Sequence, residues 1–296
     1  MVGEHTFGGA WTEQKLAKLK GYLEAYAKIF NRNPRAQYFD TYYVDAFAGT
    51  GSRSDTEANS KSDSLFPELN DPDVTKFRKG SARIALDINP GFKNFLFIEE
   101  NQERVRELEK LKVDYPSKAA QIQIKQGEAN NVLNRWCKSI DWKKTRAVVF
   151  LDPYGMQVEW SLLEAIAATK AIDLWLLFPL GTGVMRILTK KGQPPSEWSA
   201  RLTKLFGNEE WKQRFYQTNM ETDMFDGESK SYRAADCKQV ASYLVERLAT
   251  IFSEVQKTPY PLYNSKNCPL YLLVFAAGNK KGASTALRIA NDLLKD

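Results

Sequence analysis

Histidine and cysteine are scarce in this sequence. Its 296 residues include one histidine, His5, and three cysteines that are dispersed without Cys-x-x-Cys spacing. Ser-His-Asp and Cys-His catalytic centres and metal sites built on histidine or cysteine are therefore disfavoured, so no metal is expected. Unpaired thiols are typical of a reducing compartment, which predicts a cytoplasmic protein.

Long apolar runs are also missing. The longest, residues 174–180, is far too short to span a bilayer, and the N-terminus has neither a basic start nor an apolar stretch. We therefore expect no membrane association and no signal peptide. The net charge of +6 suits a polyanionic partner such as nucleic acid, but it suits a merely basic protein nearly as well.

The chain alternates predicted strands and helices, which is the pattern of a parallel sheet with helices on both faces. We expect one domain over residues 1–296, with a polar loop inserted at 52–80 and a helical insertion at 184–235. Two strand-like runs joined by a short turn near the C-terminus predict an antiparallel pair. The expected strands are 42–45, 95–100, 121–125, 147–151, 172–178, 255–263 and 270–277, seven in all.

The first predicted strand ends in an acid and breaks into a Gly-x-Gly turn. The run is Asp45-Ala46-Phe47-Ala48-Gly49-Thr50-Gly51. Glycines there let the backbone take positive φ and let a ligand approach closely. Ligands of open α/β sheets lie beyond the carboxyl ends of the strands, so this turn is a candidate binding loop.

Acids also follow the next three predicted strands. Glu99 and Glu100 end the second strand, Glu128 and Ala129 follow the third, and Asp152 follows the fourth. An acid at the second strand can accept both ribose hydroxyls of a nucleoside cofactor, and one at the third can accept the adenine amino group. Solvated loop residues are the alternative for each acid taken singly.

Two features favour S-adenosylmethionine over a dinucleotide. The glycine loop lacks the third spaced glycine that packs a helix beneath a pyrophosphate. Five parallel strands followed by an antiparallel pair are also the order expected of a Rossmann-like class I methyltransferase fold.

Asp152-Pro153-Tyr154 could supply the chemistry. An exocyclic amino group of a base is a poor nucleophile, because its lone pair is delocalised into the ring. The carboxylate of Asp152 and the carbonyl of Pro153 could accept its two protons, while the ring of Tyr154 stacks on the base. An ordinary strand-ending Asp-Pro turn is the alternative.

These motifs resemble class I S-adenosylmethionine-dependent methyltransferases, and more specifically the bacterial three-Cys-motif partner family, TcmP. The resemblance implies a partner protein with a Cys-x3-Cys-x2-Cys motif of the radical S-adenosylmethionine type, and it leaves the substrate open. The residues that carry it are Phe7-Gly8-Gly9-Ala10-Trp11-Thr12, Lys15-Leu16, the 45–51 run, Leu151-Asp152-Pro153-Tyr154-Gly155-Met156 and 270–275.

The sequence departs from the pattern of methyltransferases in two ways. Adenine amino-methyltransferases usually have two residues between the acid and the aromatic, whereas Tyr154 here follows Pro153 directly. The gap from Gly51 to Glu99 also exceeds the roughly 20 residues expected before the ribose acid, and we assign the excess to the 52–80 loop.

Three functions remain open. The first is a methyltransferase acting on an amino group of a nucleic-acid base, with tryptophans and basic residues of the 184–235 insertion contacting the substrate. The second is a non-catalytic module that keeps the fold and presents substrate to the partner. The third is a methyltransferase for a small molecule or a protein side chain. The aromatics of the insertion could equally form its own small core.

Overall fold

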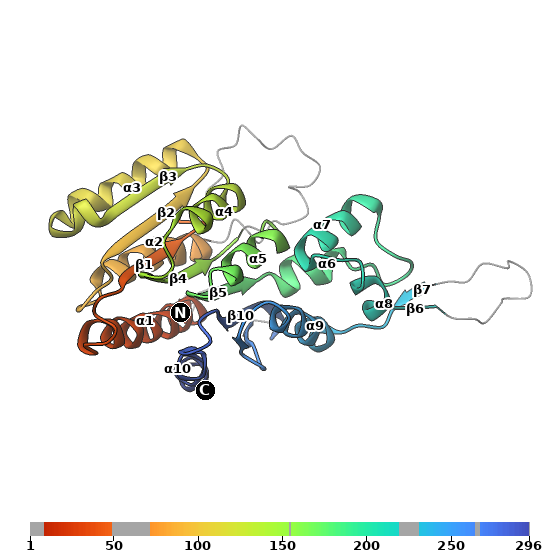
Figure 1. Ribbon diagram of the computed structural model, residues 1–296. Helices are drawn as coiled ribbons and strands as arrows, with labels where there is room; N and C mark the ends of the chain where they lie inside the picture. The colour runs from red at the N-terminus through yellow and green to blue at the C-terminus, as the bar shows by residue number, and fades with distance from the viewer. Residues whose placement is uncertain (1–8, 49–71, 154, 219–230, 264–266, 296) are drawn as a thin grey trace, which may run out of the picture.

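An eight-stranded sheet forms the centre of the molecule (Figure 1). The computed structural model describes residues 9–48, 72–153, 155–218, 231–263 and 267–295. The strand order is β3-β2-β1-β4-β5-β10-β8, with β9 also paired to β10. The strands are β1 (Asp40–Asp45), β2 (Asn94–Glu99), β3 (Ile122–Gln126), β4 (Thr145–Leu151), β5 (Ile172–Phe178), β8 (Glu254–Val255), β9 (Tyr260–Tyr263) and β10 (Pro269–Ala277).

The pairing defines the fold class. Strands β1 to β5 are parallel to one another, whereas β10 runs antiparallel to β5, β8 and β9. This is the order of a Rossmann-like class I methyltransferase fold, and the prediction of that fold is confirmed. The predicted count of seven strands is wrong by one, because the run at 255–263 is divided into β8 and β9. Pro259 lies between the two and has no N–H to donate to a ladder.

Helices cover both faces of the sheet, as parallel strands require when they are buried on both sides. One face packs on α1 (Gly9–Arg32), α2 (Pro72–Asp87), α3 (Gln102–Asp114) and α10 (Ala283–Leu294). The other packs on α4 (Ala129–Ser139), α5 (Trp160–Ala168) and α9 (Cys237–Ala249). Every residue of β5 is buried, so hydrophobic core lies on both faces of the sheet at this strand.

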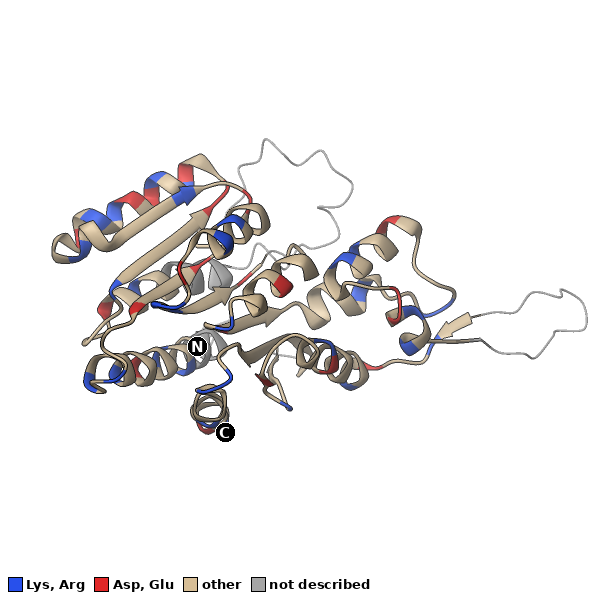
Figure 2. Cartoon of the chain, in the orientation of Figure 1, with Lys and Arg blue, Asp and Glu red and all other residues tan. Residues whose placement is uncertain are grey.

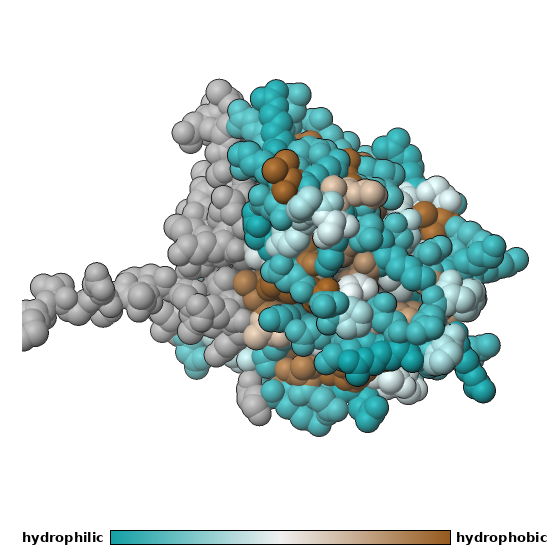
Figure 3. Space-filling view, turned by 90° about the vertical axis from the view of Figure 1, so that its left-hand side faces the viewer, coloured by the Kyte–Doolittle hydropathy of each residue, from teal (hydrophilic) through white to brown (hydrophobic). Residues whose placement is uncertain are grey.

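The surface fits this layering. The face seen in Figure 3 is mostly hydrophilic, with apolar side chains in small separate groups. No described helix is both long and apolar enough to cross a membrane.

Helix α2 overlaps the stretch that the sequence predicts as a polar loop. It begins at Pro72, so the loop prediction for 52–80 is wrong over its last nine residues, while 52–71 lie outside the described residues. Proline suits the first turn of a helix, and Gly80 serves packing: a Cβ there would lie 2.9 Å from Cδ1 of Leu16 on α1. In the sequence these two residues look like breakers, because the contact that uses the glycine is tertiary.

The stretch at 184–235 departs from the strand–helix alternation. It follows η5 (Leu180–Val184), and its described parts are α6 (Met185–Ile187), α7 (Ser196–Phe206), α8 (Trp211–Phe215), β6 (Tyr216–Thr218) and β7 (Ser231–Arg233). Trp211, Phe206 and Phe215 are fully buried, and the last two rings each lie 5.2 Å from that of Tyr243 on α9. Most of these aromatics therefore form a core, and Trp211 cannot stack on a substrate.

Gly207 fixes how this stretch meets the rest of the molecule. It ends α7 with φ +78°, and a Cβ on it would run into the ring of Trp160 at the start of α5. Only glycine provides both the left-handed backbone and the close approach.

A buried acid, Asp173, lies on the sheet face that α1 covers. The hydroxyl of Tyr22 donates to Oδ2 of Asp173 over 2.7 Å, and Asp173 lies in the middle layer of the molecule on β5. Burial raises the pKa of Asp173 to about 7, against the opposing effects of the Tyr22 hydrogen bond and the Arg146 charge.

This pKa predicts a pH-dependent stability. Between about pH 4 and pH 7 the folded protein keeps a proton on Asp173 that the unfolded chain releases, so this group's contribution falls as pH rises, by an amount on the order of a few kcal/mol. An Asp173→Asn variant still accepts the Tyr22 bond and should lose that decline. The measurement is the free energy of unfolding in urea at pH 4.5 and 7.5, with the exposed Asp141→Asn as control. An equal decline in wild type and Asp173→Asn would contradict the assignment.

Candidate functional site

The carboxyl ends of β1, β2 and β4 meet at one edge of the sheet. Strand β1 lies between β2 and β4, with Asp45 opposite Phe97 on one side and Phe150 on the other. The chain continues this contact past the strand, since Ala46 N donates to the carbonyl of Phe150 and Ala48 N to that of Ile98. The topology therefore places the predicted residues Asp45, Glu99 and Asp152 around one strand end.

Asp45 is held from two sides. It is 1% exposed, its Oδ1 accepts the Phe47 N–H at 3.2 Å, and its Oδ2 accepts the hydroxyl of Ser81 at 2.7 Å. Ser81 is fully buried on α2. The first bond tightens the start of the turn, and the second ties this acid to a helix on the sheet face. Phe47 is half-buried and Ala48 buried, whereas Gly49, Thr50 and Gly51 lie outside the described residues.

Tyr43 links the first and fourth strand ends electrostatically. Its side chain is fully buried two residues before Asp45. Burial is the main reason that the pKa of Tyr43 lies well above its usual value, and the charge of Asp45 and, less strongly, that of Asp152 raise it further, while the nearby Ser81 opposes them. Two carboxylates thus lie within reach of one neutral phenol.

Glu99 is the acid at the end of β2. It is 8% exposed, and its Oε1 accepts the Asn101 N–H at 2.8 Å and pairs with Nη1 of Arg104 at 3.6 Å. Both contacts reach the same oxygen, so within the described part of the chain Oε2 is the atom left to a ligand. Glu100 next to it is exposed.

The third strand end has a clear local role. Glu128 caps α4: its carboxylate accepts the backbone N–H groups of Asn130 and Asn131, both at 2.8 Å, and also the Asn130 side chain. A carboxylate at a helix N-terminus is stabilised by the exposed N–H groups there. Ala129, the first residue of α4, is buried.

Asn130 connects this cap to the chain that follows Asp152. Its Nδ2 donates to the carbonyl of Gln157 at 2.8 Å, and its Oδ1 accepts the Glu159 N–H at 3.0 Å. One side chain therefore holds the third strand end to the segment after the fourth.

Asp152 and Pro153 lie buried directly after β4, with Asp152 1% exposed. Tyr154 lies outside the described residues. Gly155 is buried with φ +57°, and a Cβ on it would meet no atom of the described residues within 4 Å. Met156 lies beside η5, since a Cβ built on Gly183 would be 3.3 Å from Cγ of Met156.

The assigned roles of these residues in binding and catalysis stay predictions, and the structure gives positions only for those that it describes, which leaves out Gly49, Thr50, Gly51 and Tyr154. Sequence reasoning missed Ser81 and Asn130. Ser81 lies 36 residues after Asp45, where no pattern relates the two, whereas an asparagine two residues after a capping acid is a visible signal of a helix start. Within the described ranges, no group of three His, Cys, Asp or Glu side chains could hold a metal ion.

Comparison with known proteins gives only distant likenesses. No family model and no curated protein matches the chain. A Legionella pneumophila protein of the DUF519 family superposes with a TM-score of 0.47 at 10% identity, covering 97% of this chain and 92% of that one. Spermidine synthase from Thermotoga maritima superposes with a TM-score of 0.38 at 8% identity, covering 91% of this chain and 60% of that one.

A third solved structure is the N-terminal domain of EvdMO1 with SAH, S-adenosylhomocysteine, bound. Its TM-score is 0.35 at 12% identity, with 88% of this chain and 80% of that one covered. These values are too low to transfer a site or an activity. The strand order of the sheet is what defines the fold class of this chain.

The bond between Ser81 and Asp45 predicts a stability effect. Ser81→Ala removes a donor from a buried carboxylate, which should lower the free energy of unfolding by about 1–3 kcal/mol. Arg83→Ala on the same helix is the control, because it breaks an exposed ion pair with Asp114 that is worth at most about 1 kcal/mol. Urea denaturation at neutral pH compares the two, and an equal effect would mean that the bond adds little.

Proposed function

We propose that this protein is an S-adenosylmethionine-dependent methyltransferase that acts on an exocyclic amino group of a nucleic-acid base. One observation carries the proposal. Two buried carboxylates, Asp45 and Asp152, follow adjacent central strands in a sheet with the strand order of class I methyltransferases. Burying an acid is costly unless it serves a purpose, and an acid in such a position is a candidate functional group.

The cofactor would lie across the ends of β1, β2 and β3. Asp45, the backbone from Phe47 to Gly51, and Glu99 with Glu100 are the proposed contacts for its amino-acid and ribose parts. Glu128 and Ala129 would contact the adenine; since the carboxylate of Glu128 already caps α4, the backbone at Ala129 is the simpler contact. When bound, S-adenosylmethionine supplies a methyl group activated on a sulfonium. Oε2 of Glu99, for which the described part of the chain shows no donor, fits a ribose hydroxyl.

The residues after β4 would hold the substrate amine. The carboxylate of Asp152 and the carbonyl of Pro153 would accept its two N–H groups, which directs the nitrogen lone pair toward the methyl carbon. Asp152 would then take the proton that the nitrogen releases once it carries the methyl group that the cofactor supplies. The ring of Tyr154 is the predicted stacking surface for the base.

A nucleic-acid substrate is the finer part of the proposal. Between residues 184 and 214 there are seven basic and three acidic residues, and Figure 2 shows the cations spread over this region. Four of the seven are paired with acids: Arg201 with Glu197, Lys204 with Glu159, Lys212 with Glu209, and Arg214 with Glu246. Lys190 and Lys191, together with the half-buried Trp198, are the better candidates for contact with phosphate and base.

The proposed partner, a three-Cys-motif protein, rests on the motif resemblance alone. The competing function, a non-catalytic module that presents substrate to that partner, would need the same fold. Only activity separates the two.

Cofactor binding can be measured directly. Calorimetry with S-adenosylhomocysteine should give detectable binding to the wild type, and Asp45→Asn should weaken it about 10- to 100-fold, the effect of losing a charged hydrogen bond. The Asn oxygen can still accept the Phe47 N–H, and the Asn NH2 group can donate to the Ser81 hydroxyl oxygen in place of the bond that it loses, so the fold should survive. The exposed Asp141→Asn serves as control. No heat with the wild type would rule out the cofactor.

Chemistry requires a separate assay. Transfer of labelled methyl to RNA and DNA pools should fall at least about 100-fold in Asp152→Asn, while that variant still binds S-adenosylhomocysteine. Asp141→Asn should transfer normally. Cofactor binding without any transfer by the wild type, with and without the partner protein, would favour the non-catalytic module.

A further inference from the structure

An exposed tyrosine lies among basic residues at the end of the sheet where β1 and β4 begin. Residues 33–39 join α1 to β1, and residues 140–144 join α4 to β4, so the two connections lie side by side at the amino ends of these paired strands. Strand β1 separates them from Asp45, and its six residues span ~20 Å at ~3.3 Å per residue. This end of the sheet is therefore distinct from the candidate site.

The tyrosine, Tyr38, is fixed in place although it is exposed. It is 60% exposed, its ring centre lies 4.1 Å from that of Phe39, and its hydroxyl donates to the carbonyl of Lys143 over 3.1 Å. Phe39 in turn lies 4.0 Å from the guanidinium of Arg146. A ring that is already held in one position loses little conformational freedom when a ligand stacks on it.

Backbone contacts bring lysines to this tyrosine. Lys143 supplies the carbonyl that Tyr38 bonds, and the carbonyl of Lys144 accepts the N–H of the first residue of β1 at 2.8 Å. Nζ of Lys93 donates at 2.9 Å to the backbone carbonyl of the residue before Tyr38. Two arginines follow from the end of α1 and the turn after it, and Figure 2 shows basic residues at that end of the helix. We call these exposed residues the Tyr38 surface: Arg32, Arg35, Tyr38, Lys93, Lys143 and Lys144.

Most cations of the Tyr38 surface have no acidic partner. Lys93 lies 4.0 Å from Asp40, whereas the other four form no ion pair with any residue that the structure describes. The second nearby acid is Asp141, whose Oδ1 accepts the Lys143 N–H at 3.0 Å. Five cations therefore stand against two acids. Between residues 184 and 214, by contrast, four of the seven cations are paired.

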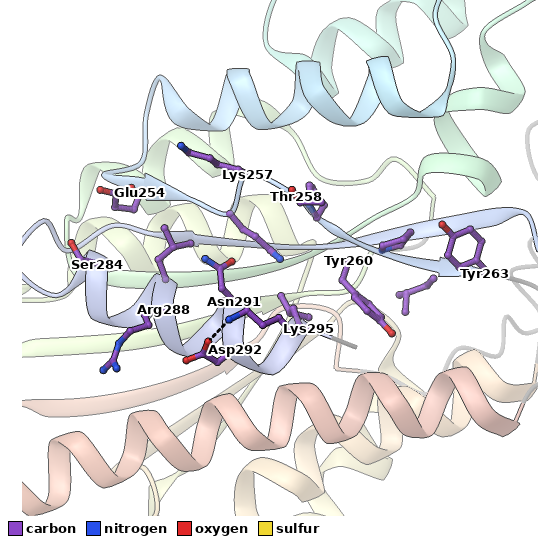
Figure 4. Close-up of a pocket in the computed structure, with 16 residues that line it drawn as sticks. Glu254, Lys257, Thr258, Tyr260, Tyr263, Ser284, Arg288, Asn291, Asp292 and Lys295 are labelled. Carbon is purple, nitrogen blue, oxygen red and sulfur yellow. Dashed lines mark hydrogen bonds and ion pairs between the residues drawn. The ribbon is translucent and has the colours of Figure 1, made fainter.

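The groove between α10 and residues 254–263 differs in its charge (Figure 4). It is lined by three cations and two acids. One of the acids, Asp292, pairs with Lys295 at 2.8 Å, and Figure 4 shows these two side chains turned toward one another. The charges of the groove nearly cancel, so the Tyr38 surface is the better place for a polyanion.

The kind of polyanion follows from the exposed ring. Single-stranded nucleic acids bind where bases stack on aromatic side chains while phosphates contact the cations beside them. A double helix keeps its bases stacked inside and has no use for the ring. A protein is a poorer occupant, because the centre of a protein interface is depleted of charged residues.

We propose that the Tyr38 surface binds single-stranded nucleic acid, with a base stacked on the tyrosine and phosphates at the unpaired cations. Binding at this surface involves neither the cofactor nor methyl transfer. The proposal therefore goes beyond the proposed function and is tested separately from it.

Fluorescence anisotropy with labelled uridine and thymidine dodecamers and the full chain tests the role of the cations. The double variant Arg35→Glu/Lys143→Glu should weaken binding at least tenfold. The slope of log Kd against log salt concentration should also fall by about 1.4, at ~0.7 for each lost phosphate contact. Lys257→Glu/Arg288→Glu makes the same charge change on exposed residues of the groove in Figure 4 and should bind as the wild type does.

Tyr38→Ala tests stacking without a change of charge. It should weaken binding about 5- to 100-fold, the effect of losing one stacked base, and Tyr38→Phe, which keeps the ring, should restore most of the affinity. Failure of the wild type to bind either dodecamer overturns the proposal, as does equal affinity of the wild type and Arg35→Glu/Lys143→Glu. Equal affinity of the wild type and Tyr38→Ala, or tighter binding of a 12-base-pair duplex, overturns the assignment to a single strand.

Discussion

The hydrogen bond from Ser81 to Asp45 is the contact on which the candidate site depends most. Asp45 ends the central strand β1, and without a buried donor its charge would be costly in that position. The donor comes from α2, which in turn packs on α1 through Gly80. The orientation of this acid is thus set by a helix on the sheet face as well as by the strand that carries it.

Much of the fold could be predicted from the sequence, because the signals were local. The apolar runs before Asp45, Glu99, Asp152 and Pro179 are strands in the structure, and the parallel order follows from their alternation with helices. The errors fall where tertiary contacts decide. Gly80 looks like a helix breaker until α1 is beside it, and residues 255–263 look like one strand until Pro259 interrupts the pairing.

The same division applies to the site. Acids at strand ends are visible in the sequence because topology gathers the carboxyl ends of parallel strands. What each acid bonds is not visible: Glu128 caps α4, Glu99 is shared with Arg104, and Asp45 is bonded from α2. The aromatics of the 184–235 stretch were equally ambiguous, since burial rather than residue type separates Trp211 from Trp198.

The contact between Gly207 and Trp160 has a consequence for how this protein can diverge. Helix α7, in the stretch that follows β5, ends at Gly207 directly against the indole of Trp160 on α5. The space between the two admits no side chain on Gly207. Exchanging that stretch with one from a related protein would therefore require the glycine and the indole to move as a pair. The 184–235 stretch looks like a replaceable module, but a single added Cβ at Gly207 would clash with the Trp160 ring. New specificity is therefore more easily gained by substitutions on the surface of this stretch than by replacing it whole.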